Sequence, residues 1–349
     1  MPPSTTTQQP PHTSSTPRRR IVIVAVGPRG DVQPYCILGQ ALTARGYDVT
    51  IATEARLKAL VTAEFGLPFA PIAGDVYGGL FDIEFQHRFR VARSLKCLEI
   101  LTEWNDQFDI DDVLASYVSA LAGADVVVCG GVLSITQTYS IAEKHGLTWV
   151  PLFLGTCPLP TNEFPHWVLA GVPFGFLCSH HWSHSIVASK GWLQQRKHIN
   201  KWRRHTLGLP PITSPLGIVD AMQTNDNITI YQASSLLLCV PQIPCPVIMD
   251  QFHHANNMVA LGVAPAVVHK GSLYGSYVAK LVTQVLRNDR NIQTTAKDLG
   301  KFVNTESFDN TDRFCDWVVA APPTFASPPS EQQSDGVVNR LGDSCLIAA

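Results

Sequence analysis

Residues 27–34, Gly-Pro-Arg-Gly-Asp-Val-Gln-Pro, hold the side chains whose types and spacing are best suited to chemistry. They follow the apolar run Ile21–Val26, which is typical of a buried parallel strand. They precede Tyr35–Gly46, where apolar residues recur at helical spacing. Because ligands of doubly wound α/β sheets bind at the carboxyl ends of the strands, this turn places Arg29 and Asp31 at the edge of a predicted cleft.

Asp31 is the candidate general base of this turn, since a positioned carboxylate can take a proton from a bound hydroxyl group. Aspartate is also favoured at helix N-termini, where the helix dipole stabilises its charged form and weakens it as a base. A capping role is therefore the alternative interpretation. Gly27 and Gly30 have a structural interpretation, because glycine allows a tight turn and a close backbone approach.

The composition excludes several classes of protein. A net charge of -2 across 349 residues does not indicate a general nucleic-acid binder. No segment approaches the roughly 20 apolar residues of a membrane span. The polar, then basic, start of the sequence does not resemble a secretory signal, and the nine cysteines include no Cys-x-x-Cys pair. We therefore expect a cytoplasmic protein with reduced thiols and no bound metal.

The pattern after the first strand alternates between strands and helices. We expect strands at 48–53, 69–72, 125–129 and 148–153, and helices at 56–64, 85–104, 110–122 and 134–145. This order predicts a Rossmann-like, doubly wound parallel sheet with helices on both faces, of the α/β class.

The second half of the chain is less regular. Residues 154–190 carry prolines, aromatics and histidines without periodicity, which suits a pocket wall. A further short strand is expected at 227–231. A basic helix is expected at 191–207, and further helices at 253–261, 273–287 and 294–303. The Pro/Ser-rich ends are expected to be disordered.

The turn sequence resembles the glycosyltransferases that include the sterol glucosyltransferases, whose opening motif is Gly-(Ser/Thr)-Arg-Gly-Asp-(Val/Thr)-(Gln/Glu)-Pro. Pro28 replaces the hydroxyl residue of that motif. Other segments resemble the same family in the same order: 38–42, 46–49, 161–165, 200–211, 240–242 and 250–251. The resemblance runs from about Ile21 to Leu286, and several ordered matches are more specific than any one of them.

The resemblance implies the GT-B architecture, in which two Rossmann-like domains face each other and bind the acceptor and the nucleotide sugar respectively. It implies an inverting transfer of a hexose from a UDP-sugar co-substrate, with no further cofactor, to a hydroxyl of a lipophilic acceptor such as a sterol or terpenoid. Asp31 would be the base, and Gly27, Arg29 and Gly30 would form the turn beside the acceptor. The donor sugar and its nucleotide would be held by three residues: Gln242, Asp250 and Gln251. A helix N-cap before 252–261 is the alternative interpretation of Asp250 and Gln251.

The sequence departs from the family in its donor half. The family carries a His-His-Gly-Gly-Ala-Gly-Thr type loop before the Pro-Gln segment, and this sequence has none. Residues 236–305 are also fewer than the roughly 100 to 150 that a doubly wound domain needs. We therefore expect a disordered tail at 1–19, an acceptor domain at 20–235, a remnant of the nucleotide-sugar domain at 236–305, and a mostly disordered tail at 306–349.

Two other functions compete with transfer. A truncated, catalytically inactive relative would only bind a lipid or a protein partner, and the missing glycine loop favours it. A nicotinamide-dependent oxidoreductase would need an acidic residue about 20 positions after the glycines, and Glu54 lies near that position. The incomplete glycine fingerprint and the later family matches argue against the oxidoreductase.

Two residue clusters have both a structural and a functional interpretation. His180, His181 and His184 could ligate a metal on a helix, but no carboxylate joins them, so pocket or surface histidines are favoured. The basic helix at 191–207 interleaves lysines and arginines with Trp192, Ile199 and Trp202. We favour a solvated helix with inward aromatics, and peripheral contact with an anionic membrane is the functional alternative.

Overall fold

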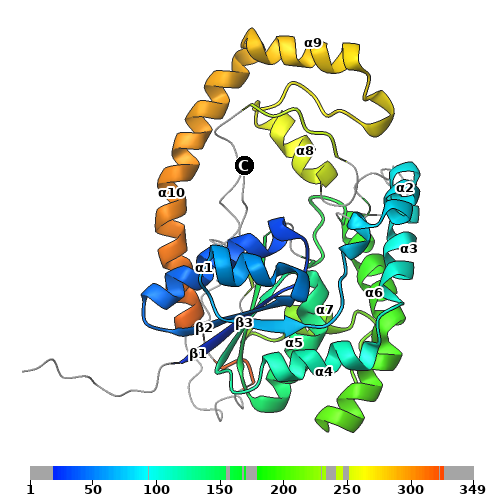
Figure 1. The fold of residues 1–349 in the computed structure, drawn as a ribbon, viewed down its shortest axis with the longest axis vertical. Helices are drawn as coiled ribbons and strands as arrows, with labels where there is room; N and C mark the ends of the chain where they lie inside the picture. The colour runs from blue at the N-terminus through cyan, green and yellow to red at the C-terminus, as the bar shows by residue number, and fades with distance from the viewer. Residues whose placement is uncertain are drawn as a thin grey trace, which may run out of the picture.

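The computed structural model describes residues 19–325, except 93, 155–157, 167–168, 170–178, 229, 233–240, 247–250 and 322. Within this part, a parallel sheet lies between layers of helices, and three further helices extend beyond it (Figure 1). The strands are β1 Arg20–Ala25, β2 Asp48–Glu54, β3 Phe69–Ile72, β4 Val126–Gly130, β5 Thr148–Phe153 and β6 Tyr231–Gln232.

The strand order is β3-β2-β1-β4-β5-β6, and every pairing is parallel. Ile21 of β1 aligns with Val49 of β2 on one side and with Val126 of β4 on the other. The chain winds outwards in one direction from β1 to β3 and in the other from β4 to β6. This is the doubly wound order expected from the sequence, and its switch point lies between β1 and β4.

The helices are α1 Arg29–Ala44, α2 Ile83–Val91, α3 Ser94–Asn105, α4 Ile110–Ala120, α5 Ile135–His145, α6 His180–Trp202, α7 Ile218–Thr224, α8 Gln251–Ala260, α9 Gly275–Leu286 and α10 Ile292–Ala320. The expected helix at 56–64 is two short turns, a 3₁₀ turn at Ala55–Leu57 and a π-helical turn at Leu60–Glu64.

Three helix boundaries differ from the sequence prediction. α1 begins at Arg29 rather than after Pro34, because a proline inside the helix costs one backbone hydrogen bond without ending it here. The single helix expected at 85–104 is two helices, since Ala92 has an extended backbone at the end of α2. α6 begins at His180, eleven residues before the predicted start at 191.

The two faces of the sheet bury different helices. Ile21, Ile23 and Ala25 of β1 pack in one apolar cluster with residues of α1 and α10. Val22 and Val24 point to the opposite face and pack with residues of α4, α5 and α6. This alternation follows from the two-residue period of a strand, and burial on both faces explains why β1 is almost wholly apolar.

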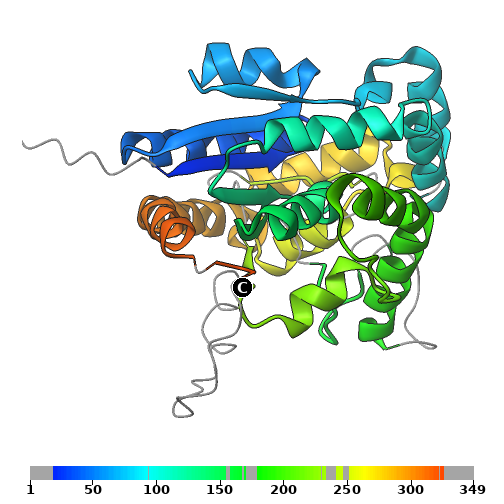
Figure 2. The same ribbon diagram turned by 90° about the horizontal axis from the view of Figure 1, so that it is seen from below.

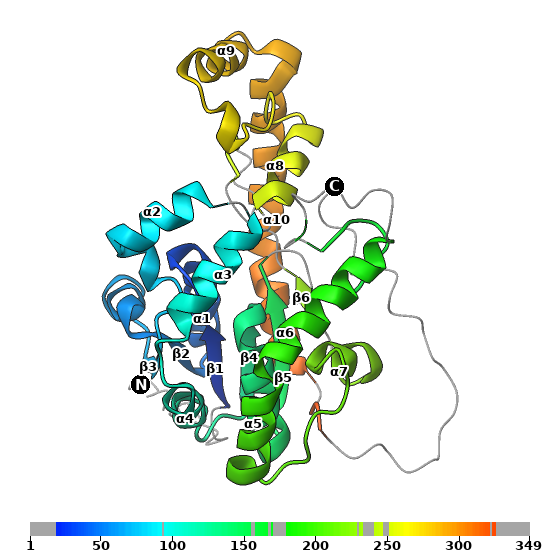
Figure 3. The same cartoon turned by 90° about the vertical axis from the view of Figure 1, so that its right-hand side faces the viewer.

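The C-terminal region of the described chain is helical. After β6 the described residues form α8, α9 and α10 and no strand. Residues 261–274, with a 3₁₀ turn at Lys270–Ser272, connect α8 to α9, and residues 287–291 connect α9 to α10. α8, α9 and the start of α10 lie on the side of the sheet toward which the strands run (Figure 3). This part of the chain therefore contributes no second sheet among the described residues.

α10 returns to the first domain and ends against α1 (Figures 1 and 2). Arg45 pairs with Asp312 and Asp316 of α10, and Cys315 and Val318 are fully buried in the cluster that includes α1. The prediction of a mostly disordered tail from 306 is therefore wrong up to Ala320. The sequence pattern showed a helix only to 303, because α10 presents apolar residues to the sheet layer mainly near its end.

We expect Val318→Ala to lower the free energy of unfolding by about 2 kcal/mol, because it removes two buried methyl groups and leaves a cavity. Val91→Ala on α2 is the matched control, since Val91 is 69% exposed, and it should cost less than about 0.5 kcal/mol. Chemical denaturation of the two variants measures both values. Equal, small effects would show that α10 does not pack on the sheet layer in solution.

Candidate active site

The segment between β1 and α1 presents Asp31 at the carboxyl edge of the sheet. Pro28 has an extended backbone immediately before the helix, and the Asp31 N–H donates to its carbonyl at 2.9 Å. Asp31 thus lies in the first turn of α1, and its side chain is exposed. The sequence predicted this position, and the structure places the carboxylate where a ligand of a doubly wound sheet would lie.

Gly27 makes this arrangement possible. Its φ of 156° is rarely adopted by L-residues, and a Cβ built on it would lie 2.5 Å from Asp31 Oδ2. The carboxylate therefore folds back over the Gly27 backbone, and a side chain here would displace it. Gly30 differs, because a Cβ built there meets nothing within 4 Å. Its predicted role in a tight turn is not seen, since Gly30 lies within α1.

Arg29 does not point into a cleft. Its guanidinium forms two hydrogen bonds with the Glu64 carboxylate, at 2.9 and 2.6 Å, and its Nε donates to Gln33 Oε1 at 3.0 Å. Both charged side chains are exposed, and the pKa of Arg29 is raised by its hydrogen bond and ion pair with Glu64. Exposed ion pairs contribute little to stability, so this pair mainly fixes the direction of the Arg29 side chain.

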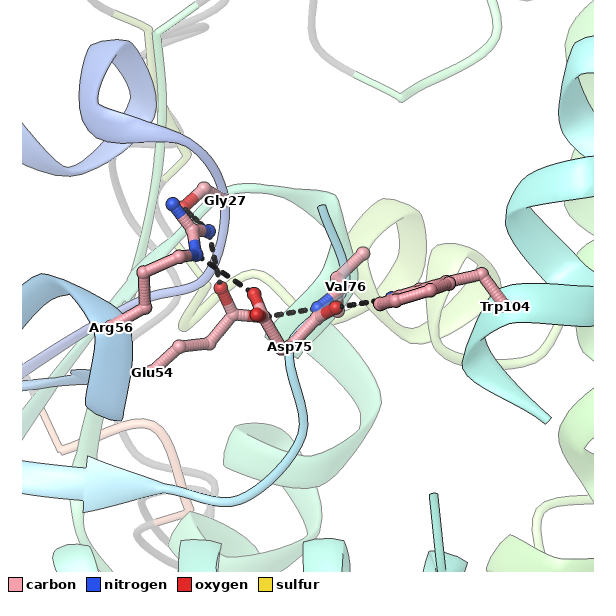
Figure 4. Close-up of polar contacts among 6 residues, drawn as sticks. All are labelled: Gly27, Glu54, Arg56, Asp75, Val76 and Trp104. Atoms are coloured by element: carbon pink, nitrogen blue, oxygen red, sulfur yellow. Dashed lines mark hydrogen bonds and ion pairs between the residues drawn. The ribbon is translucent and has the colours of Figure 1, made fainter. Parts of the chain in front are cut away.

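Next to this turn, Arg56 joins the ends of three strands (Figure 4). Its guanidinium lies 3.0 Å from Glu54 at the end of β2 and 2.8 Å from Asp75 after β3. It also donates to the Gly27 carbonyl at 3.5 Å, a long bond that reaches the backbone under Asp31. Trp104 of α3 donates from its indole nitrogen to the Asp75 carbonyl at 2.8 Å. The Arg56 network therefore ties α3 and the first three strands to the segment that carries Asp31.

Glu54 is the buried member of this network, with a side chain only 1% exposed. Burial raises the pKa of its carboxyl, whereas the Val76 N–H bond at 2.5 Å and the charge of Arg56 act in the opposite direction. Both carboxylate oxygens are thus engaged inside the protein. This does not suit the nicotinamide alternative, in which Glu54 would hold a ribose. Sequence analysis missed Arg56, because Asp75 and the Gly27 carbonyl approach it only in the folded chain.

Tyr35 links α1 to the far side of the switch point. Its hydroxyl donates to the Leu152 carbonyl of β5 at 2.8 Å, and a Cβ built on Gly130 would lie 2.7 Å from its ring. Burial raises the pKa of Tyr35 well above its usual value, and the nearby Asp31 carboxylate adds to the effect. Tyr35 is therefore a neutral donor that holds α1, and with it Asp31, against β4 and β5.

The predicted acceptor-side loop at 161–165 is held by the start of α6. His180 Nδ1 lies 2.9 Å from the Asn162 carbonyl, and His184 Nε2 lies 3.1 Å from the Phe164 carbonyl. Ser183 accepts the N–H of His166 at 2.8 Å. The histidine spacing thus serves to fasten a loop. Among the described residues no three His, Cys, Asp or Glu side chains form a group that could hold a metal.

This loop should respond to acid. Burial lowers the pKa of His166 to about 3, with a smaller contribution from His184, and burial also lowers the pKa of His184. A histidine with a depressed folded pKa stabilises the protein above its unfolded pKa of about 6.5, and this stability is lost as the pH falls toward the folded pKa.

We therefore expect acidification from about pH 6.5 to about pH 5 to remove about 2 kcal/mol through His166. Urea unfolding at the two pH values measures this loss. It should be smaller in His166→Gln than in the exposed control His198→Gln. A loss of the same size in both variants would show that other groups cause the acid sensitivity.

The predicted donor residues lie apart from the sheet. The Gln242 N–H donates to the Val263 carbonyl at 2.9 Å, and Gln251 is the first residue of α8. α8 lies beyond the carboxyl ends of the strands (Figure 3). Asp250 lies outside the described residues. Gln242 and Gln251 are thus positioned by the C-terminal helices, whereas Asp31 is positioned by the sheet.

Residues 21–148 match the glycosyltransferase family 28 N-terminal domain. The chain is similar to the sterol 3-beta-glucosyltransferase of Debaryomyces hansenii, with 29% identity over 196 residues, which cover 54% of this chain and 11% of that protein. It is also similar to the UDP-sugar-dependent glycosyltransferase 52 of Dictyostelium discoideum, with 28% identity over 202 residues, 56% of this chain and 11% of that protein. The matched part is about a tenth of the length of these curated relatives.

Two solved structures have a similar fold. The glycotransferase of kitacinnamycin superposes with a TM-score of 0.56 at 12% identity, over 88% of this chain and 100% of that one. The calicheamicin glycosyltransferase CalG4 superposes with a TM-score of 0.50 at 12% identity, over the same shares of 88% and 100%. At these identities the likeness shows the fold alone. The expected α/β class and the GT-B resemblance are confirmed.

Proposed function

We propose that this chain, which carries a glycosyltransferase family 28 N-terminal domain over residues 21–148, transfers a hexose from a UDP-sugar to a hydroxyl of a lipophilic acceptor. The similar sterol 3-beta-glucosyltransferases support a sterol-like acceptor, and the similar UDP-sugar-dependent enzyme supports the donor. The observation on which the proposal chiefly rests is the exposed Asp31 carboxylate at the carboxyl edge of β1, in the first turn of α1.

The oxygen of the acceptor hydroxyl attacks the anomeric carbon of the sugar, and Asp31 takes the proton of that hydroxyl. The new bond joins that carbon to the acceptor oxygen, and the bond to the diphosphate oxygen breaks. UDP leaves as an anion, the proton stays on Asp31, and the configuration at the anomeric carbon inverts. Gln242, Asp250 and Gln251 are proposed to hold the donor through hydrogen bonds to its hydroxyls and nucleotide.

The departing diphosphate needs positive charge or dipoles nearby. Arg56 does not supply a spare charge, because Glu54 and Asp75 already balance it. The backbone N–H groups at the start of α1 form a dipole end that favours anions. We therefore assign diphosphate stabilisation to the N-terminus of α1 and to the C-terminal helices rather than to the Arg56 network.

A second candidate is a protein that binds the acceptor without transferring sugar. The described residues after β6 favour it, because they form helices and no strand, whereas a complete donor domain of this architecture contains a sheet. Calorimetric titration distinguishes the two functions. Affinity for a 3β-hydroxysterol without affinity for UDP supports the binder, and affinity for both supports the transferase.

The direct test is incubation with UDP-glucose and a 3β-hydroxysterol, followed by mass spectrometry of the lipid fraction. The proposal expects a product heavier than the sterol by one hexose, together with released UDP. Absence of both the product and UDP affinity would overturn the transferase.

A further inference from the structure

The outer surface of α6 has an unusual charge distribution. The sequence holds no aspartate or glutamate between Glu163 and Asp220. The same stretch holds these cations: Lys190, Arg196, Lys197, Lys201, Arg203 and Arg204. The whole chain has a net charge of -2, so this positive charge is local. Of the six, Arg203 is buried and pairs with Glu143 at 2.8 Å.

The other five cations are not neutralised by an ion pair in the described part of the chain. Among the described residues, no carboxylate lies within ion-pair distance of them. Lys190, Arg196, Lys197 and Arg204 also line two open grooves beside α6, with volumes of about 510 and 620 Å³. The larger groove lies between α6 and the segment 212–215. Neither groove is lined by residues of the sheet edge, so they are separate from the candidate active site.

Apolar side chains share this outer surface. Trp192, Ile199 and Trp202 face inward and are buried, as the sequence analysis favoured. Trp182 is instead 64% exposed, Ile186 37% and Leu193 51%. Residues 182, 186, 193 and 197 recur at intervals of four or seven and therefore lie along one side of α6. Arg204 follows in the π-helical turn Arg203–Leu207. We call this stripe, which also includes Lys190 and Arg196, the outer face of α6.

We propose that the outer face of α6 binds the surface of a membrane that contains anionic phospholipids. Lysine and arginine attract the headgroups, and tryptophan with aliphatic side chains enters the boundary between headgroups and acyl chains. An acidic protein or a nucleic acid would match the charge but would leave Trp182, Ile186 and Leu193 without a partner. No helix in the described part of the chain is both long and apolar enough to cross a bilayer, so the contact would be peripheral.

The placement of α6 relates this contact to the candidate active site. The start of α6 lies on the side of the sheet toward which the strands run (Figure 3), and it holds the loop at 161–166. An acceptor that partitions into lipid would thus reach the protein close to that loop. Membrane binding does not depend on sugar transfer. A negative result in the transfer assay therefore does not bear on the vesicle-binding assay, and the reverse also holds.

Sedimentation with vesicles tests the proposal. The full chain should bind phosphatidylcholine vesicles that contain phosphatidylserine more tightly than pure phosphatidylcholine vesicles, and added salt should weaken the binding. Each basic residue near an anionic surface contributes about fivefold, so Arg196→Gln with Lys197→Gln should weaken binding about 25-fold. The matched control is Lys58→Gln with Lys297→Gln, which removes the same charge from exposed positions elsewhere and should leave binding within about twofold.

A second variant separates a membrane from other polyanions. Trp182→Ser with Leu193→Ser should weaken vesicle binding without changing binding of a duplex oligonucleotide. Both side chains are exposed, so the fold should be kept, and circular dichroism checks this. No binding to the anionic vesicles, equal losses in the control pair, or no effect of the Trp182 and Leu193 changes would overturn the proposal.

Discussion

Asp31→Asn is expected to reduce sugar transfer by about 10²- to 10⁴-fold, because a positioned general base contributes that much to a proton transfer. The amide keeps the size of the side chain, which folds back over Gly27, so the protein should stay folded. The turnover number should carry most of the loss, while the affinity for the acceptor changes little. The measurement is the initial rate of UDP release at saturating acceptor.

Glu64→Gln is the matched control for this variant. It also changes a carboxylate to an amide close to α1, and it removes the ion pair with Arg29. Because that pair is exposed on the surface, activity should remain within about twofold of the unaltered protein. If Asp31→Asn and Glu64→Gln have equal rates, Asp31 is not the base, and a negative charge in the first turn of α1 that favours the helix dipole is the better interpretation.

Arg56→Met is expected to destabilise the protein by about 3–5 kcal/mol, since it leaves the buried Glu54 carboxylate without its ion-pair partner. Transfer should fall as well, because Arg56 connects the strand ends to the Gly27 backbone under Asp31. Arg56 therefore acts as a positioning residue, and its effect on stability is measurable by urea unfolding whether or not activity is present.

The pH dependence of the Arg56→Met variant separates charge from packing. Arg56 opposes the rise in the pKa of Glu54 caused by burial, so its removal should raise that pKa further. A carboxyl with a raised folded pKa binds its proton more readily in the folded protein, and stability is regained as the pH falls. The loss in free energy of unfolding caused by Arg56→Met should therefore be smaller at acid pH than at neutral pH. At neutral pH the same loss should be smaller when Arg56→Met is made together with Glu54→Gln. A deficit independent of pH and of Glu54 would mean that lost packing dominates.

The sheet and the position of Asp31 follow from local patterns in the sequence. Each strand near the switch point is a short apolar run, and both faces of the sheet are covered, so the runs are easy to recognise. Asp31 follows the first of these runs and lies within residues 27–34, the segment that resembles the opening motif of the family. Position in the chain is then enough to place the residue at the carboxyl edge, because the architecture fixes where parallel strands end.

The Arg56 network could not be predicted in the same way. It joins residues from the ends of three strands, and its geometry depends on how the β3–α2 segment returns toward Arg56 (Figure 4). Arg29, by contrast, was expected beside the cleft, but the nearby Glu64 carboxylate holds it on the surface. Charged side chains select their partners in three dimensions, so sequence spacing gave little information on either arginine.

α10 and α6 show a second reason for the differences. Val318 and Cys315 are buried by contact with α1, which is far away in the sequence. The length of α10 was therefore underestimated from its local sequence pattern. α6 begins within a stretch where histidines hydrogen-bond to a loop, so its first turns lack the apolar period that marks a helix.

The most direct test of the central claim is the anomeric configuration of the lipid product formed from UDP-glucose and a 3β-hydroxysterol, measured by the proton coupling at the anomeric carbon. The donor sugar is α-linked, so single displacement assisted by Asp31 predicts a β-glucoside, formed about 10²- to 10⁴-fold more slowly by the Asp31→Asn variant. An α-glucoside, or equal amounts of product from both proteins, would contradict the account.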